Sequence, residues 1–295
     1  MKNAAQAAVN RQSLAQRMRS YRKRPGSFIL HLITLVAAMA TAAALLFLIG
    51  YILVMGLPHL KPELFSLHYT SENLSFLPAI INTMIMTLLA LLIAAPLGIF
   101  AAIYLVEYTG RGNRLVAVVR TTAETLSGIP SIVYGLFGML FFVTYLGWGY
   151  SLLAGAFTLA IMILPLIMRT TEEALRSVPD SYREGSFGLG AGRLRTVFRV
   201  VLPSAVPGIL AGVILAIGRV VGETAALIFT AGTVTELPEN LMSSGRTLAV
   251  HMYVLSNEGL HTDQAYATAV MLLLIVLCIN WFSAFVAKRL TKGQR

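Results

Sequence analysis

Charge is scarce in this sequence, and that scarcity excludes most soluble proteins. Only 12% of the 295 residues are Asp, Glu, Lys or Arg, whereas 57% are hydrophobic. A typical soluble domain carries about 25% charged residues, most of them on its surface. The composition therefore predicts a protein that crosses a membrane several times.

Cysteine is almost absent as well. Cys278 is the only one and lies in a hydrophobic run, so we expect a small buried apolar residue. A single cysteine excludes a disulfide framework and a Cys-based metal cluster. His251 and His261 are ten residues apart, which is not a metal-ligand spacing, and we expect both at the surface. The sequence predicts no metal site.

Motifs for nucleotide chemistry and hydrolysis are also missing. The chain lacks the G-x-x-x-x-G-K-[ST] loop that cradles ATP phosphates. The glycine-rich stretch 188–192 has neither a strand before it nor a helix signal typical of a nucleotide site. In a chain this apolar we identify no catalytic arrangement of the Ser/His/Asp or Cys/His type. We therefore expect a protein that is not itself an enzyme and that binds no cofactor.

Six hydrophobic segments are long enough, or nearly so, to cross a bilayer core, which takes about 20 apolar residues. They cover residues 28–55, 78–106, 126–145, 152–168, 205–231 and 268–287. The first is much longer than the core of a cleaved signal peptide, so we expect a retained membrane helix. The predicted fold class is all-α. The expected organisation is a basic N-terminus (1–27), a first helix (28–56), a five-helix core (78–287) and a tail (288–295).

Positive charge is distributed unevenly among the loops. Of the 23 Lys and Arg residues, twenty fall in the N-terminus, the 107–125 loop, the 169–204 loop and the C-terminal tail. Lys61 and Arg246 fall in the alternate loops. Because cytoplasmic loops accumulate Lys and Arg, both termini are expected in the cytoplasm. This topology explains the net charge of +10 better than a nucleic-acid surface does, and no nucleic-acid partner is expected.

Two charged residues lie near the middle of the fifth segment, Arg219 and Glu223. A charge at the bilayer centre costs roughly 2.5–3.5 kcal/mol, and residues four apart on a helix can pair. Such a pair either fixes two helices together or presents a guanidinium to a transported anion. Arginine suits phosphate because its planar fork donates two parallel hydrogen bonds. Both interpretations stay open at this point.

The third and fourth segments carry weaker signals. Gly128 and Pro130 interrupt the third segment, and Ser127 or Ser131 could line a path there. Irregular backbone is tolerated in membranes only where protein or water satisfies it, although a plain proline kink is the alternative. Arg169 directly follows the fourth segment. Its position needs no explanation beyond that of a positive charge at the cytoplasmic end of a span.

A basic stretch between the fourth and fifth segments has a distinctive spacing. Three residues separate Glu184-Gly185-Ser186 from Gly190, and nine more precede Val200-Val-Leu-Pro203. The layout resembles the EAA loop of ABC importer membrane subunits, E-A-A-x3-G-x9-I-x-L-P, although Gly185-Ser186 replaces Ala-Ala. The resemblance implies a short coupling helix within residues 173–203 that docks on a separate ATPase; an ordinary cytoplasmic loop is the alternative. The implied docking residues are Glu184, Gly185, Ser186, Gly190, Leu202 and Pro203. Pro203 is expected to break the chain before the fifth segment.

Further segments resemble the permeases of phosphate ABC importers. Residues 218–226 look like a signature of these permeases, and residues 125–135 resemble their third helix. Asn82-Thr83, residues 96–104 and Glu107-Tyr108 match the start of the importer core. The resemblance covers about residues 78–290. It implies phosphate as the substrate and associates Arg169, together with Arg219 and Glu223, with the substrate pathway.

The same resemblance implies partners and a location. It places the chain in the bacterial inner membrane beside a homologous second permease (PstC-like). Two ATPase subunits (PstB-like) would bind ATP and Mg, and a periplasmic phosphate-binding protein (PstS-like) would deliver phosphate. Three other functions remain open. They are import of another oxyanion such as sulfate or molybdate, a proton-coupled carrier that uses Arg219 and Glu223 as its relay, and a membrane anchor or sensor.

Overall fold

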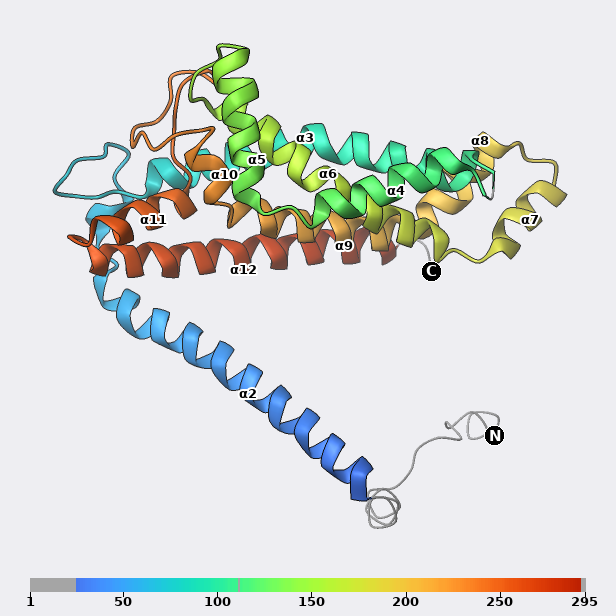
Figure 1. Cartoon of the computed structure of the whole chain (residues 1–295), viewed down its shortest axis with the longest axis horizontal. Helices are drawn as coiled ribbons and strands as arrows, with labels where there is room; N and C mark the ends of the chain where they lie inside the picture. The colour runs from blue at the N-terminus through green and yellow to red at the C-terminus, as the bar shows by residue number, and fades with distance from the viewer. Residues whose placement is uncertain (1–24, 111, 293–295) are drawn as a thin grey trace. The chain divides into compact units, whose positions relative to one another are not determined.

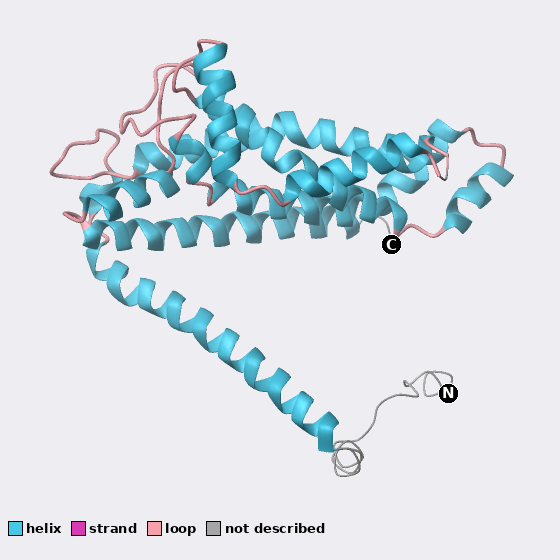
Figure 2. Cartoon of the chain, in the orientation of Figure 1, coloured by secondary structure: helices cyan, strands magenta, loops and turns pink. Residues whose placement is uncertain are grey.

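The computed structural model describes residues 25–110 and 112–292, and every regular element within them is a helix (Figures 1 and 2). The longer helices are α2 (Pro25–Gly56), α3 (Leu77–Ile103), α4 (Arg114–Ser127), α6 (Leu152–Arg176), α9 (Leu202–Val221), α11 (Leu248–Glu258) and α12 (Thr262–Lys292). The shorter ones are α5 (Ser131–Gly138), α7 (Asp180–Gly188), α8 (Arg193–Thr196) and α10 (Ala225–Ile228). The predicted all-α fold is confirmed for these residues. Most of the predicted basic N-terminus and the end of the tail lie outside them.

The chain divides into two units, one up to Val54 and one from Met55 onward. The first unit contains nearly all of α2, a single helix of 32 residues. Residues 28–55 contain no Asp, Glu, Lys or Arg. At 1.5 Å per residue the helix is about 48 Å long, which exceeds the roughly 30 Å hydrocarbon core. The predicted first membrane helix is therefore present.

In the second unit, α3, α6 and α9 pack side by side at points where one helix has a small residue. Four such contacts are Gly155 with Met86 and Gly98 with Ile167 between α6 and α3, and Gly208 with Ala174 and Gly212 with Thr170 between α9 and α6. Along α3 and α6 the contacting residue numbers rise together, so these helices are parallel. Along α6 and α9 one number rises as the other falls, so they are antiparallel. Successive membrane spans alternate in direction, so the second and fourth spans must be parallel and the fourth and fifth antiparallel. The directions of α3, α6 and α9 agree with this.

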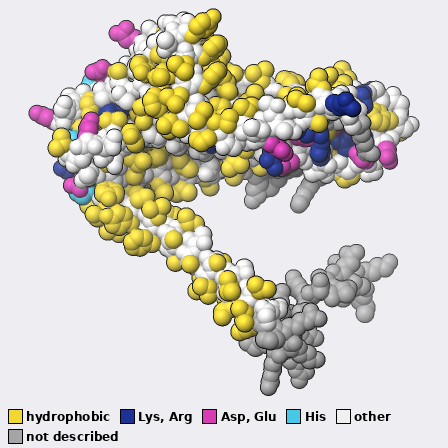
Figure 3. All heavy atoms as spheres, viewed as in Figure 1, with side chains coloured by type: hydrophobic (Ala, Val, Ile, Leu, Met, Phe, Trp, Pro, Cys, Tyr) yellow, Lys and Arg dark blue, Asp and Glu magenta, His cyan; other side chains and the backbone are white. Residues whose placement is uncertain are grey.

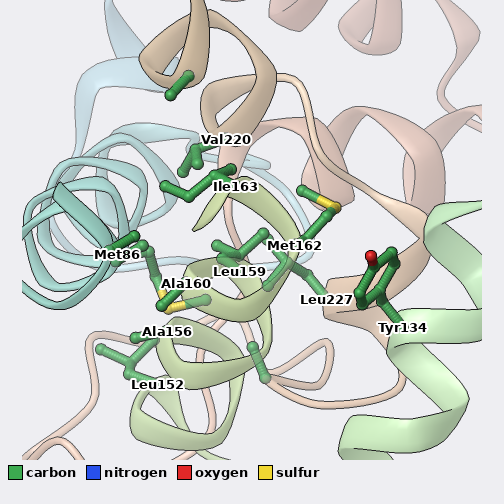
Figure 4. Close-up of a cluster of buried hydrophobic side chains, with 14 of the residues drawn as sticks. Met86, Tyr134, Leu152, Ala156, Leu159, Ala160, Met162, Ile163, Val220 and Leu227 are labelled. Atoms are coloured by element: carbon green, nitrogen blue, oxygen red, sulfur yellow. The ribbon is translucent and has the colours of Figure 1, made fainter. Parts of the chain in front are cut away.

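A central core joins these helices (Figure 4). Met86 of α3, Leu159 and Ile163 of α6, Val220 of α9 and Leu227 of α10 are buried in it. In a bilayer, lipid is as apolar as leucine, so helices associate through close packing rather than through exclusion from water. The alanines and glycines along α3, α6 and α9 permit that close approach.

The third predicted span is sharply bent. α4 ends at Ser127, α5 begins at Ser131, and their axes meet at 100°. Pro130 cannot donate a helical hydrogen bond, and it disfavours the helical conformation at Ile129. The Tyr134 hydroxyl donates to the Leu126 carbonyl at 2.8 Å and so satisfies one carbonyl at the end of α4. The predicted interruption is confirmed, as a turn rather than a shallow kink.

Among the described residues, five helices are long and apolar enough to cross a membrane alone, and there are six spans when the bent pair α4–α5 is counted as one (Figure 1). Counted in this way, the number of spans agrees with the prediction. The prediction of a loop at 107–125 is wrong, because these residues contain most of α4. Asn113 begins that helix, since its side-chain oxygen accepts a hydrogen bond from the Leu115 amide at 2.9 Å. Val116 and Ala123 face the core at helical spacing, a signal that the arginines obscured.

The boundaries of the fourth and fifth spans also differ from the prediction. α6 continues to Arg176 rather than ending near 168, because ion pairs four residues apart stabilise its polar last turns. These pairs join Arg169 to Glu173 at 3.2 Å and Arg176 to Glu172 at 2.8 Å. α9 ends at Val221, ten residues before the predicted limit.

Two predicted environments are wrong. Cys278 is exposed on the side of α12, because an apolar run does not reveal which side of a helix faces the core. His251 has no exposed surface, because α11 packs under the loops that precede α3. The stretch between the fifth and sixth predicted segments, residues 232–267, therefore contains a packed helix.

Apolar side chains cover much of the second unit and charged side chains lie toward its two ends, with most of the visible Lys and Arg at the end that carries α7 and α8 (Figure 3). Exposed leucines along α3 illustrate the apolar surface, among them Leu88, Leu92 and Leu97. An apolar belt with charges at its ends suits a bilayer. We refer below to the end with most of the Lys and Arg as the α7 end.

Candidate functional site

Arg219 lies two residues before the end of α9 and is half-buried, at mid-depth in the second unit. It lines an open groove of about 570 Å³ with Leu166 of α6 and Asn280 of α12. Those two residues lie near the middle of their long helices, so Arg219 is level with the centre of the spans even though its own helix ends there. The predicted central position is thus right, but for a different reason.

Glu223 does not continue the helical face of Arg219. Gly222 ends α9, and the Glu223 carboxylate accepts a hydrogen bond from the Ala226 amide at 3.1 Å. The side chain is buried and caps the start of α10. Among the described residues, no ion pair joins Arg219 to Glu223. The expected i, i+4 pair is therefore not formed, because a helix break falls between its members.

Arg219 lies close to the bend of the third span. Its guanidinium interacts electrostatically with the Tyr134 hydroxyl, which itself donates to Leu126 at the end of α4. Ser127 and Ser131 flank the bend and are partly buried. The Ser127 hydroxyl donates to the Ala123 carbonyl at 2.9 Å.

The wall behind the bend depends on a glycine. A Cβ on Gly135 would lie 2.8 Å from the Ala226 Cα, so α5 and α10 touch through their backbones. This contact holds the bend against the helix that Glu223 caps. The bend, Arg219 and Glu223 therefore belong to one local structure.

Arg169 occupies a different place. It lines a cavity of about 160 Å³ nearer the α7 end, beside Arg120 and Glu173, and its side chain is 57% exposed. Glu172, also in this cavity, binds Arg120 at 2.6 Å and Arg176 at 2.8 Å. The structure does not bring Arg169 and Arg219 into one cavity. It does reveal a charged cluster between α4 and α6 that the sequence analysis did not identify.

The predicted coupling segment contains a short projecting helix. α7 covers Asp180–Gly188, so Glu184, Gly185 and Ser186 all lie on it. None of its residues is buried, and Figure 1 shows it at the far end of the second unit. Gly190 follows with φ +81°, a left-handed conformation that favours glycine. A helix, a glycine turn and a return to the spans are what the spacing predicts.

Leu202 and Pro203 begin α9, but Pro203 does not break the chain. Residues 193–221 form one continuous span, and a π-helical turn at Val197–Val201 precedes the proline. Proline is tolerated there because the π-helical turn already interrupts the regular α-helical hydrogen bonding just before it.

The exposed surface of the coupling segment is partly apolar. Tyr182 and Phe187 are about half exposed, and Leu189 is 90% exposed. Apolar side chains beyond the ends of the spans would have water as their neighbour in an isolated chain. This surface is therefore suited to a protein partner.

Metal chemistry has no visible support. In the parts of the chain that the structure describes, no group of three or more His, Cys, Asp or Glu side chains is placed to hold a metal ion.

The fold and site define a helical protein with several candidate membrane spans and a short exposed helix beyond their ends. Residues 94–292 match the family model described as binding-protein-dependent transport system inner membrane component. The chain belongs to this family, and it is a permease subunit of an ABC importer.

Curated relatives support the same family. The chain is 36% identical to a probable ABC transporter permease, YqgI of Bacillus subtilis, over 87% of this chain and 94% of the relative. It is 37% identical to the phosphate transport system permease protein PstA of Pasteurella multocida, over 79% and 84% of the two chains. PstA 1 of Mycobacterium tuberculosis is 35% identical over 74% and 71%.

Solved structures share the fold. A chain of a bacterial alginate ABC transporter, in complex with a periplasmic protein bound to an alginate pentasaccharide, matches with a TM-score of 0.68. The match covers 93% of this chain and 99% of that one at 16% identity. An inward-facing chain of the MetNI methionine transporter matches with a TM-score of 0.57 at 20% identity, over 72% and 93%. These matches establish the fold of type I ABC importer permeases.

Proposed function

We propose that this chain is a permease subunit that carries inorganic phosphate across the bacterial inner membrane, driven by separate ATPase subunits. The main support is Arg219, a guanidinium at mid-depth among the spans that forms no ion pair with a described carboxylate. A charge at mid-depth among membrane spans without a charged partner is costly, and a transported anion would offset part of that cost. The names of several relatives, which are phosphate permeases, favour phosphate among the oxyanions.

The side chains at the bend suit a dehydrated anion. Arg219 offers parallel N–H donors, which bind a phosphate oxygen pair better than a point charge does. Glu223 does not compete for the guanidinium, because its carboxylate caps α10. Ser127 and Ser131 are the nearest hydroxyl groups on either side of the turn along the chain. Arg169, nearer the α7 end, would meet the anion later as it leaves.

In this proposal the α7 end faces the cytoplasm, where the ATPase subunits dock on α7 through Glu184, Gly185 and Ser186 and on the following turn through Gly190. Closure of the ATPase pair then tilts the spans and opens the pathway outward, toward a periplasmic phosphate-binding protein. A second, homologous permease completes the pathway, since one chain supplies only one wall. Both termini lie in the cytoplasm.

A proton-coupled carrier is the weaker alternative. A relay needs its acid and base in contact, whereas Arg219 and Glu223 are separated by a helix break. Such a carrier also has no use for the exposed docking helix.

The test of substrate is selective uptake. The whole complex, with both permeases, ATPase subunits and binding protein, is reconstituted in proteoliposomes with ATP inside. We expect ATP-dependent accumulation of labelled phosphate that a tenfold excess of sulfate or molybdate does not suppress. Suppression by sulfate or molybdate, with little phosphate accumulation, would assign the importer to another oxyanion. Accumulation driven by a proton gradient without ATP would support the carrier.

A further inference from the structure

We propose that Arg183 is the positioning residue that connects the ATPase-docking helix to the membrane spans. In this account, movement of α7 reaches α3 and α6 through the Arg183 side chain. The inference rests on the proposed docking of an ATPase on α7, and it assigns a specific residue to the transmission step.

Such a residue is needed because α7 makes few packing contacts with the rest of the protein. No residue of this helix is buried, and most of its side chains are exposed. A cavity of about 770 Å³ lies between α7 and the start of α4, with Arg183 and Phe187 on one side and Arg114 and Ala117 on the other. Apolar packing therefore contributes little to the position of α7. Its polar contacts must transmit any force.

Arg183 makes most of those contacts. Its Nη2 donates to Glu107 Oε1 at 2.7 Å, and its Nε donates to the same carboxylate at 3.2 Å. Its Nη1 donates to the Val178 carbonyl at 2.8 Å, and Nη2 also donates to the Leu175 carbonyl at 2.9 Å. The side chain is only 14% exposed, and that of Glu107 only 8%. Charge-assisted bonds are strongest where solvent is excluded.

The partners of Arg183 lie on two different spans. Glu107 is in the π-helical turn Tyr104–Tyr108 that continues α3, so it ends the span Leu77–Tyr108. Leu175 lies in the last turn of α6, the helix that packs against both α3 and α9, and Val178 lies two residues beyond the end of α6. A rigid link from α7 to these ends reaches the helices that surround the centre of the second unit.

The chemistry requires arginine in particular. A guanidinium has five N–H donors fixed in one plane and can bind a carboxylate and two carbonyls together. Lysine has a compact ammonium group and cannot span the same partners. On the other side, Ser186 and Thr196 are joined by one hydrogen bond of 2.8 Å between their hydroxyls. That bond connects α7 to α8, which continues into the span of α9, so the link to α3 and α6 is left to Arg183.

The test measures coupling, not uptake alone. Arg183→Gln, Arg183→Lys and Glu107→Gln are prepared in the whole complex in proteoliposomes, and phosphate uptake and ATP hydrolysis are measured on the same samples. We expect Arg183→Gln to assemble and hydrolyse ATP, while phosphate moved per ATP falls at least tenfold. Arg183→Lys should be intermediate. In the double variant Arg183→Gln, Glu107→Gln, the phosphate moved per ATP should be no lower than in the poorer single variant. The reason is that the two changes remove the same contact.

The matched control is Arg176→Gln, which removes an arginine at the same end that binds Glu172 rather than α7. It should keep the wild-type ratio. A wild-type ratio in Arg183→Gln would overturn the inference, and so would additive losses in the double variant. Loss of assembly with an unchanged ratio in the remaining complexes would mean that Arg183 only stabilises the fold. If the wild-type complex itself moves no phosphate, the proposed substrate fails, whereas the ratio of binding-protein-stimulated to basal ATP hydrolysis still tests the link.

Discussion

At position 251 the chain places a histidine with no exposed surface, beside Tyr69 and Arg246. Burial, and then the positive charge of Arg246, lower the pKa of His251 from 6.5 to about 3. Arg246 is also buried, and its guanidinium lies 4.8 Å from the Tyr69 ring centre. The folded chain thus keeps a neutral imidazole beside a fixed cation.

This arrangement predicts a pH-dependent loss of stability. Between pH 6.5 and about 3 the unfolded chain binds a proton at residue 251 that the folded chain does not bind. The free energy of unfolding therefore falls as the pH falls through this window and is unaffected above it. Thermal unfolding of the purified complex in detergent should give lower midpoints at pH 5 than at pH 7. The variant His251→Gln should show a weaker dependence over this interval; an unchanged dependence would contradict the assignment.

Glu223 offers a second prediction at the residue scale. If its carboxylate serves to cap α10, Glu223→Gln keeps an acceptor oxygen and should assemble normally. Glu223→Ala removes the acceptor and should cost about 1 kcal/mol of stability, the usual value of a lost cap. Unfolding midpoints of the assembled complex separate the two. Equal destabilisation by both variants would show that the negative charge, rather than the hydrogen bond, matters at this position.

At the scale of elements, the coupling segment depends on one backbone conformation. Gly190 has φ +81°, while Gly192, two residues later, has an ordinary φ of −71°. Neither glycine has an atom within 4 Å of the position that a Cβ would take, so space is not the constraint.

Replacement of these two glycines therefore isolates the conformation. Gly190→Val should strain the turn by roughly 1–2 kcal/mol and misplace α7. We expect normal membrane insertion but loss of ATPase binding or of coupling between hydrolysis and uptake. Gly192→Val is the matched control and should stay close to wild type. Normal coupling in Gly190→Val would count against the docking role of this segment.

The sequence predicted elements best where one signal dominated. Hydrophobic length located all six spans, and Gly128 and Pro130 located the bend. It failed where polar residues extend a helix. At the end of α6 the cause is ion pairs four residues apart, and at α4 it is arginines beside a narrow apolar face, and a hydropathy average detects neither. It also failed for Arg219 and Glu223, since their spacing assumed a continuous helix across Gly222. The link between Glu107 and Arg183, 76 positions apart, depends on tertiary structure that no local pattern contains.

At the scale of the whole molecule, the orientation in the membrane is a direct prediction of the charge distribution. Single cysteines at Lys61 and Leu260, in a background without Cys278, should react with an impermeant thiol reagent added outside intact cells. A cysteine at Arg193 should react only after the cells are opened. All three positions are exposed in the structure, so access alone does not separate them. The opposite labelling pattern would reverse the topology and remove the ATPase from α7.

The central claim is that Arg219 meets the transported phosphate. The most direct measurement is phosphate uptake by proteoliposomes that contain the whole complex, normalised to assembled protein, for wild type, Arg219→Gln and the double variant Arg219→Gln, Glu223→Gln. Each charge-assisted hydrogen bond contributes roughly 1.5–3 kcal/mol, so the loss of Arg219 should lower uptake by about 10- to 100-fold or more. The double variant should assemble but show no recovery, because no neutral side chain supplies those donors. Uptake close to wild type in either assembled variant would contradict the account and leave Arg219 a structural residue.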